Sequence, residues 1–473
     1  LFGGGALACG LVESLTPLLV ARGVQATGGA AVLVCSYALI GHTEAGARGW
    51  RLALLLGTAA GPAIGGALTQ AFGWRSIFLI QAPVVLLALP AYLRAPRRRD
   101  APAARRPAAD ARLPLDRVIA LALLSGALAA ALFLTVLLLI SGWSVEPLAA
   151  AAAVSIMPLA ALASARIRGP AATRAAGGSL LVAAGTASLA FVPTASVAWT
   201  VVPQLLVGVG MGLALPAVAG ELLPESTGRH AAALLSVRHA GIALALVLLA
   251  PIAQHELNTT LETTKEKGAA VVLDAPIDPR IKLDLAPDLA SSVQSEDPRG
   301  GLDKAFADHR DDVDDDDLEA YDEMRRRADE TLVAGVNDGF SVAFLIGGAL
   351  ALLAAVALAT REAVSSPRLA VAAVGATLLV PAAYALVART DKPPAVTIAD
   401  PCDDRDLPGS GGLPGIIQDA AMVALDRVAC KAGSSREELV LAMVDDEAAK
   451  RYEERYGLDP RSALDLARTA LGG

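Results

Sequence analysis

The stretch LLLGTAAGPAIGGAL, residues 54–68, decides which class of fold this chain adopts. It places four glycines and a proline inside an apolar run. In a water-soluble helix each glycine costs about 1 kcal/mol relative to alanine, and a proline costs about 3 kcal/mol. That penalty is smaller in lipid, because water does not compete for the backbone there and small residues let neighbouring helices approach closely. The stretch therefore predicts a helix that packs inside a membrane.

The composition of the whole chain also indicates a membrane protein. The 473 residues are 54% hydrophobic and only 19% charged, with a mean hydropathy of +0.51, whereas soluble domains are about 25% charged. Apolar runs of about 20 residues, the length that crosses a bilayer, recur along the sequence. We predict an all-α polytopic protein with about 11 transmembrane helices, at residues 1–15, 17–40, 50–72, 74–93, 118–141, 147–165, 176–193, 199–220, 232–254, 339–360 and 369–388.

The distribution of charge predicts the orientation of the chain. Arginine-rich connections alternate with connections that lack Lys and Arg, such as residues 141–147 and 192–199. We place the arginine-rich connections in the cytoplasm, because cytoplasmic connections carry the excess of Lys and Arg. Residues 256–335 hold 22 acidic and 10 basic side chains, and this acidic segment then lies outside. The arginine-rich connections are residues 94–106, 165–174, 227–238 and 361–368.

The same features divide the chain into six parts. Residues 94–116, rich in Arg, Pro and Ala, are typical of a solvated tether between two bundles. Within the acidic segment we expect irregular structure over 272–292 and helix over 302–335. The chain opens in an apolar run at Leu1, without an initiator Met or signal-peptide features, so we expect a longer natural protein. The parts are an N-terminal bundle (1–93), a cytoplasmic linker (94–116), a second bundle (117–255), an acidic extracytoplasmic loop (256–335), two final spans (336–389) and a soluble helical domain (390–473).

Three consecutive apolar runs carry a family pattern. The run at 17–40 holds Arg22, Gln25 and Gly28, and the run at 74–93 opens with Trp-Arg-Ser-Ile-Phe. Together with the run between them, they resemble the fourth, fifth and sixth spans of the major facilitator superfamily, most closely its multidrug/proton antiporter branch. The fourth-span pattern departs at Ala26, where the family has glycine. The fifth-span motif, G-x-x-x-G-P-x-x-G-G, is matched at every defined position by Gly57, Gly61, Pro62, Gly65 and Gly66.

The resemblance implies a fold, an activity and partners. It implies two bundles of six spans that work by alternating access, with two spans of the first bundle missing from this chain. The antiporter motif implies proton-coupled export of small amphipathic or cationic compounds across the inner membrane of a bacterial cell. The implied partners are the small-molecule substrate, protons and the bilayer, and no cofactor is implied.

The resemblance also assigns roles to the motif residues. Arg22, Gln25 and Gly28 are candidates for proton coupling or for shaping the central cavity. Alternatively, Arg22 extends to the membrane interface, as long charged side chains do. The motif glycines would let the fifth span pack tightly against a partner near the bundle interface, with Pro62 shaping a bend. Generic small-residue packing is the alternative reading of the glycine stripe.

The second half resembles the family more loosely. Residues 202–217 look like its tenth span, which makes Gln204, Gly208 and Gly212 candidates for lining the cavity of the second bundle. Arg238 and His239 are further candidates there. His239 is a possible proton relay, although a histidine near a helix end is commonly a surface group. Residues 165–174 keep the basic residues of the family's gating motif but lack its acid.

The polar tail contains a candidate disulfide. Cys402 and Cys430 lie outside if residues 369–388 span the membrane, and their disulfide would close a loop of about 28 residues, worth ~3 kcal/mol in the chain-entropy model. Arg389 and Lys392 argue mildly for the opposite side. No metal site is expected, because the acidic run at 311–317 lacks the glycine that a calcium-binding loop requires.

Two other classes of function are alternatives to transport. A transporter-like scaffold that serves as a membrane anchor or sensor is favoured by the acidic loop, the tail and the shortage of acids inside the spans. An enzyme is not expected, because no catalytic constellation lies near a membrane surface and no Walker or dinucleotide motif occurs. No nucleic-acid partner is expected, and the partner of the C-terminal domain is unassigned.

Overall fold

The computed structural model describes residues 1–40, 44–88, 90, 114–222, 228–293, 297–359, 367–390, 396–409 and 412–462. Every regular element within these residues is a helix, which confirms the expected all-α fold. The helices are α1 (Phe2–Leu11), α2 (Leu15–Ile40), α3 (Glu44–Phe72), α4 (Ser76–Leu79), α5 (Gln81–Leu87), α7 (Leu115–Leu137), η1 (Leu138–Gly142), α8 (Pro147–Val154), α9 (Ile156–Ser164), α10 (Ala171–Ser188), η2 (Leu189–Phe191), α11 (Val197–Pro216), η3 (Ala217–Leu222), α12 (Gly228–Leu273), α13 (Pro279–Val293), α14 (Pro298–Asp308), η4 (Arg310–Asp312), α15 (Leu318–Leu358), α16 (Pro367–Thr390), α17 (Gly412–Ala432), α18 (Arg436–Val444) and α19 (Asp446–Tyr456).

Six of the described helical segments are long and apolar enough to cross a membrane. Two shorter apolar segments, Phe2–Leu11 and Ser76–Leu87, accompany them. The chain is therefore a multi-pass membrane protein, while the total of about 11 spans stays a prediction. The six segments are Leu115–Gly142, Pro147–Ser164, Val197–Ala219, Ala233–Leu273, Leu318–Leu358 and Val371–Thr390.

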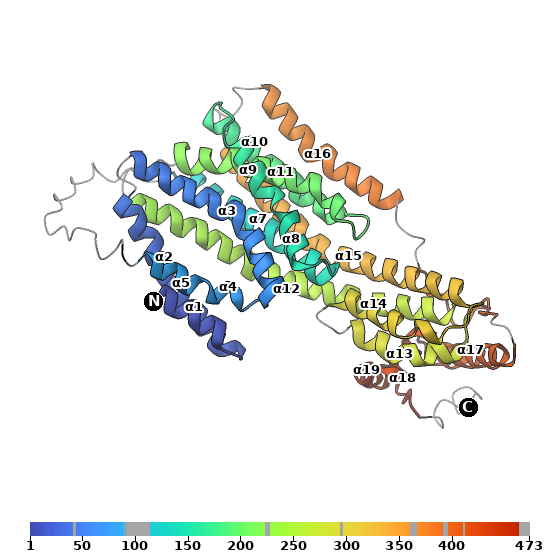
Figure 1. The fold of residues 1–473 in the computed structure, drawn as a ribbon. Helices are drawn as coiled ribbons and strands as arrows, with labels where there is room; N and C mark the ends of the chain where they lie inside the picture. Colours follow the sequence, from blue (N-terminus) through green and yellow to red (C-terminus); the bar gives the residue numbers. More distant parts are fainter. Residues whose placement is uncertain are drawn as a thin grey trace.

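The helices of the second half approach one another closely at glycines (Figure 1). A Cβ on Gly178 of α10 would lie 2.6 Å from the carbonyl oxygen of Gly210 on α11. Further along α10, a Cβ on Gly185 would overlap the carbonyl oxygen of Pro203. Small residues let helix backbones come into van der Waals contact, which is the main source of helix association in lipid. The glycines of these spans therefore allow the backbones of neighbouring helices to pack closely.

Helices α12 and α15 are much longer than a membrane span. The 46 residues of α12 extend about 69 Å at 1.5 Å per residue, whereas the hydrocarbon core is ~30 Å thick. α15 has 41 residues and packs along α12. Both helices therefore continue past one end of the bundle, where they carry α13 and α14 (Figure 1). We call residues 256–335 the insertion.

The expectation of irregular structure over residues 272–292 was wrong for most of that segment. The structure has α13 from Pro279 to Val293. Pro279 begins the helix, where a missing N–H costs nothing. Ile281 and Leu285, one turn apart, are buried against the rest of the insertion, and this burial stabilises the helix despite Pro287 within it.

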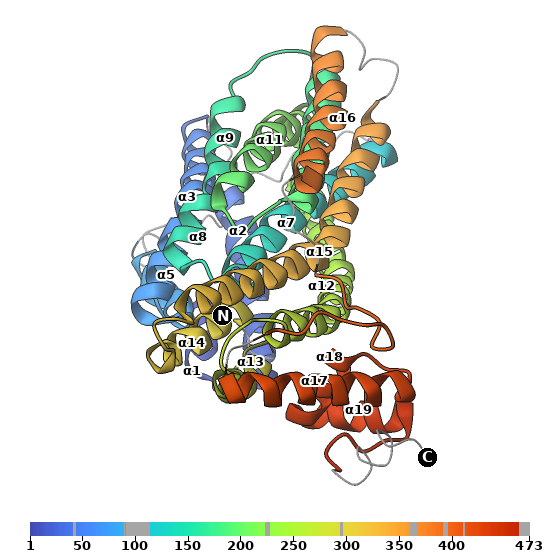
Figure 2. The same cartoon turned by 90° about the vertical axis from the view of Figure 1, so that its right-hand side faces the viewer.

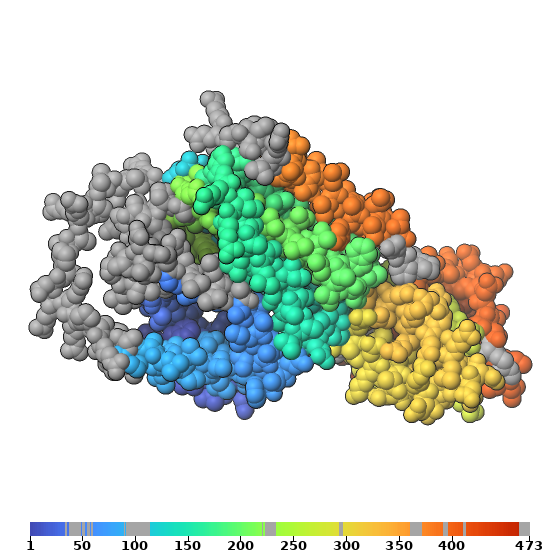
Figure 3. Space-filling view, turned by 45° about the horizontal axis from the view of Figure 1, so that its top comes forward, coloured from blue at the N-terminus to red at the C-terminus, as the bar shows by residue number. Residues whose placement is uncertain are grey.

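The C-terminal domain, residues 396–462, is a small helical unit at the same end of the molecule as the insertion. Its helices α17 and α18 lie beside α13, and α19 packs against α18 (Figure 2). In a space-filling view the yellow insertion and the orange-red C-terminal domain adjoin (Figure 3). Cys402 and Cys430, the candidate disulfide pair, are joined by a disulfide. This bond ties the segment before α17 to the end of α17.

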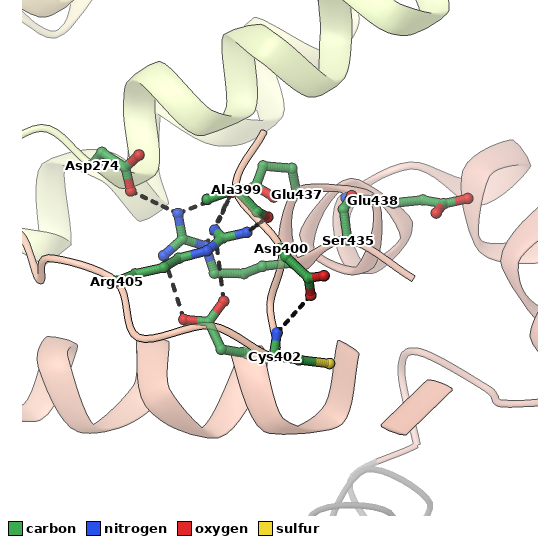
Figure 4. Close-up of polar contacts among 10 residues, drawn as sticks. Asp274, Ala399, Asp400, Cys402, Arg405, Ser435, Glu437 and Glu438 are labelled. Atoms are coloured by element: carbon green, nitrogen blue, oxygen red, sulfur yellow. Dashed lines mark hydrogen bonds and ion pairs between the residues drawn. The ribbon is translucent and has the colours of Figure 1, made fainter. Parts of the chain in front are cut away.

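A buried cluster of charges fixes the C-terminal domain to the end of α12 (Figure 4). Arg436 Nη2 lies 2.6 Å from Asp274 Oδ1 and 2.9 Å from Glu437 Oε1. Arg405 Nη1 lies 2.9 Å from the same Glu437 oxygen. The side chains of Arg436 and Glu437 are each 1% exposed. Asp426 of α17 faces both arginines, and burial raises the pKa of its carboxyl group although Arg436 and Arg405 oppose that shift.

Candidate functional site

The N-terminal helices bring together a polar network around Gln25. Arg22 Nη1 donates to Gln25 Oε1 over 2.7 Å, and Gln25 Nε2 donates to Gln81 Oε1 over 2.7 Å. Cys9 Sγ of α1 lies 3.7 Å from Gln25 Oε1. The Arg22 guanidinium also lies 5.1 Å from the centre of the Phe78 ring. The exposed Arg22 side chain is thus paired with a buried amide and with an aromatic ring.

Two glycines bring α1 against α2 at this network. A Cβ on Gly5 would lie 2.7 Å from the backbone nitrogen of Gln25, and a Cβ on Gly28 would overlap the backbone of Phe2. Gln25 is 3% exposed as a result, so its amide is held in place by packing as well as by hydrogen bonds. Among the three predicted residues, Arg22 and Gln25 are in direct contact, and Gly28 forms the neighbouring helix crossing.

Gln81 is a member of the network that sequence reasoning missed. It lies 56 residues from Gln25, so no helical periodicity connects the two. The sequence held one indication of this contact, because Gln81 is a polar amide within an apolar run, as Gln25 and Gln204 are. A buried amide in lipid needs hydrogen-bond partners, which made each of these glutamines a candidate for contact with another.

The antiporter motif lies on α3, which packs against α8 of the second half. A Cβ on Gly66 would overlap the Ala151 side chain and lie 2.7 Å from the Pro147 carbonyl oxygen. One turn on, Gln70 Nε2 donates to Glu146 Oε2 and Gln70 Oε1 accepts from the backbone N–H of Leu148, both over 3.0 Å. This end of α3 is therefore a contact between the two halves of the chain.

The other three glycines of the motif do not lie in close contact with a described helix. A Cβ on Gly57, Gly61 or Gly65 would meet no described atom within 4 Å. Pro62 lies inside α3, which continues on both sides of it. Within the described residues, Gly66 is thus the motif glycine in close helix contact, and roles for the other three stay predictions.

The candidates on α11 lie between neighbouring helices. A Cβ on Gly208 would overlap the carbonyl oxygen of Met157, and a Cβ on Gly212 would overlap that of Ala161, both on α9. Gln204 is fully buried, and its Nε2 donates to Thr200 Oγ1 over 2.8 Å. Its Oε1 has no hydrogen-bond partner among the described residues. The glycines serve packing here, and a cavity role for this face of α11 stays a prediction.

Arg238 and His239 are exposed on α12. His239 Nδ1 lies 2.8 Å from the carbonyl oxygen of Leu235, one turn back on the same helix. Both partners of this contact belong to α12. A proton-relay role for His239 therefore stays a prediction.

An ion pair between a buried arginine and a half-exposed glutamate, at one end of the second half, was not predicted from the sequence. Arg174, 8% exposed, pairs with Glu221 of η3, and Arg174 Nε also donates to the Gly169 carbonyl oxygen over 3.0 Å. Nearby, Arg117 Nη1 donates to the Leu222 carbonyl oxygen over 3.0 Å. Residues 165–174 lack an acid of their own, and Glu221 supplies the carboxylate from 47 residues away. The only signal in the sequence was an acid directly after a long apolar run.

These features define a polytopic helical membrane protein whose two halves meet at α3 and α8. A family model described as Major Facilitator Superfamily matches residues 1–246 of the 473. The chain belongs to the major facilitator superfamily.

Curated relatives of this chain include proteins of Mycobacterium tuberculosis that are named for multidrug resistance or drug efflux. The chain is 43% identical over 96 residues to "Multidrug resistance protein Stp", 35% identical over 91 residues to "Drug efflux pump JefA" and 36% identical over 91 residues to "Multidrug resistance protein B homolog". These matches cover 19%, 18% and 18% of this chain and 18%, 18% and 17% of the respective relatives. The matched part of this chain therefore spans less than a fifth of each relative.

Proposed function

We propose that this protein is a secondary transporter that exports small amphipathic or cationic compounds by alternating access, coupled to proton entry. The family membership supports transport rather than enzymatic catalysis, and the names of the relatives support drug efflux. The observation that carries the proposal is the position of the antiporter-motif helix. α3 meets α8 of the second half at Gly66 and Gln70, where two bundles that alternate must move against each other.

The location that we propose is the inner membrane of a bacterial cell. The insertion and the C-terminal domain lie at one end of the bundle, and the arginine-rich connections are assigned to the cytoplasm by the positive-inside rule. We therefore propose that both the insertion and the C-terminal domain lie outside the cell membrane. The substrate, protons and the bilayer are then the partners of the spans.

A substitution at the α3–α8 contact tests the proposal. Gly66→Leu adds a side chain where a Cβ already overlaps Ala151, so we expect efflux by cells that express it to be lost while membrane insertion is unchanged. Ala67→Leu is the matched control, because it adds a similar side chain at the next position, which is exposed. Normal efflux by a correctly inserted Gly66→Leu protein would contradict the proposal.

The second candidate function is a non-transporting membrane anchor or sensor. The observation that favours it is the size of the ordered unit outside the bundle, built from the extensions of α12 and α15 together with the C-terminal domain. Wild-type protein that reaches the membrane and exports none of a panel of lipophilic compounds would favour this candidate.

A further inference from the structure

A large apolar cavity lies between the insertion and the C-terminal domain. It has a volume of about 610 Å³ and is walled by α12, α13 and α15 on one side and by α17 and α18 on the other. Small-molecule sites in proteins have volumes of about 300–1,000 Å³ and mostly apolar linings. The apolar lining includes Val272, Leu289, Leu332, Met422, Leu425 and Met443. The cavity is therefore of a size and character that suits one small amphipathic molecule.

The charged groups of the lining are mostly basic, in contrast to the surface around them. Among the residues that the structure describes, the lining contains the bases Lys265, Arg280 and Lys282 and one acid, Asp445. The insertion as a whole carries 22 acidic and 10 basic side chains. A basic lining within an acidic segment favours a ligand with a negative charge, because opposite charges attract strongly where water is partly excluded.

Lys282 is the buried cation of this lining. It is 6% exposed, and its Nζ donates to the Leu273 carbonyl oxygen over 2.8 Å. Burial lowers the pKa of Lys282 to about 8, while Asp274 and Asp419 act to raise it and Arg436 acts to lower it further. An ammonium group has three N–H donors, so Lys282 can keep the Leu273 bond while donating to an anion in the cavity.

A second cavity lies beside α12, on the side of this region nearer the spans. It has a volume of about 870 Å³ and extends from Phe133 of α7 and Phe340 of α15 along α12 to Lys265. Lys265 lines both cavities. The two cavities therefore follow one another along α12, from the level of the spans into the unit outside the bundle.

We propose that the cavity between the insertion and the C-terminal domain binds an amphipathic anion of the fatty-acid class, with one alkyl chain, which reaches it along α12 from the ends of the spans. The alkyl chain occupies the apolar walls, and the carboxylate accepts a hydrogen bond from Lys282. The proposal names a substrate class for the transporter and in that respect rests on the proposed function. Occupancy of the cavity is nevertheless an equilibrium property that is measured without transport.

Photolabelling of the full chain in lipid nanodiscs tests the proposal. The probe is a palmitic acid that carries a photoreactive diazirine on its alkyl chain, and mass spectrometry identifies the labelled peptides. We expect labelling of peptides from α13 and α17. A matched probe with an amine in place of the carboxylate should label these peptides much less. Labelling confined to the spans, or equal labelling by both probes, would overturn the proposal.

Two variants examine the cavity itself. Gly268→Leu projects a side chain into the cavity where a Cβ meets no described atom within 4 Å, and leucine favours helix more than glycine does. Lys282→Met removes the cation, and loss of a hydrogen bond to a charged group should lower labelling about 10-fold or more. Lys304→Met, at an exposed position of α14, is the control. Labelling of α13 and α17 that Gly268→Leu leaves unchanged would contradict a ligand in this cavity.

The binding result and the transport result are separable. Cavity labelling that depends on Gly268 and Lys282, in a protein that exports nothing, would uphold the binding site and reject the proposed function. Export by a wild-type protein whose cavity is not labelled would uphold the proposed function and reject the binding site.

Discussion

Removal of Arg436 should release the C-terminal domain from the end of α12. Arg436→Met keeps most of the side-chain volume and removes the charge that Asp274 and Glu437 share. Glu437 is 1% exposed, so its carboxylate stays out of water after the substitution. Breaking a buried ion pair by removing one partner costs about 3–5 kcal/mol.

The expected magnitude lies at the lower end of that range. Asp274 is 54% exposed and regains water when its partner is lost, and Arg405 remains 2.9 Å from Glu437. We therefore expect the opening free energy of α18 to fall by about 3 kcal/mol, which corresponds to more than a 100-fold increase in amide exchange.

Arg451→Met provides the matched control. Arg451 also joins the C-terminal domain to α12, through Glu262 at 3.0 Å, but the two side chains are 52% and 53% exposed. Exposed pairs contribute about 0.2–1 kcal/mol, so amide exchange should rise less than about 6-fold. The assay is hydrogen–deuterium exchange of the full chain in nanodiscs, read on peptides of α18. A rise below about 10-fold for Arg436→Met, or equal rises for both variants, would show that the buried Arg436 ion pairs do not hold α18 in place.

Three other predictions concern separate sites. Replacing Cys402 and Cys430 by serine should lower the stability of the C-terminal domain by roughly 3–4 kcal/mol in the chain-entropy model; protease resistance of the purified protein would measure this, and unchanged resistance would contradict it. Binding of the anionic palmitic acid probe should weaken from pH 7 to pH 9.5, because Lys282 loses its proton near its pKa of about 8; Lys282→Met should remove this pH dependence, and a flat wild-type profile would count against it. Glu221→Gln should increase amide exchange of η3 about 10-fold, because Arg174 is left buried with a weaker partner; exchange equal to that of the wild type would show that the pair does not stabilise this end.

The all-α membrane fold followed from local features of the sequence. The glycine-rich run at 54–68 and the repeated apolar runs are stable as helices only where lipid replaces water. Disulfide pairing of Cys402 with Cys430 followed from their shared place in the tail. The expectation of irregular structure over residues 272–292 was wrong because the burial of Ile281 and Leu285 stabilises α13 although Pro287 lies within it.

The candidate site was predictable only where its contacts are local. Arg22 and Gln25 lie one turn apart on α2, and periodicity places them together. Gln81 and Glu221 were missed because each partner lies about 50 residues away, and a single sequence contains no measure of such proximity. The cavity outside the bundle was missed for the same reason, since its walls come from two segments separated by the last span.

The most direct test of proton-driven export is the retention of lipophilic compounds by an efflux-deficient bacterium that expresses this chain. A panel of lipophilic cations and alkyl carboxylates would be measured with and without a protonophore, beside cells that express Gly66→Leu at the same level. We expect cells that express the chain to retain less of at least one compound, and we expect both the protonophore and Gly66→Leu to abolish this reduction. Retention equal to that of cells without the chain, with the protein present in the membrane, would contradict it.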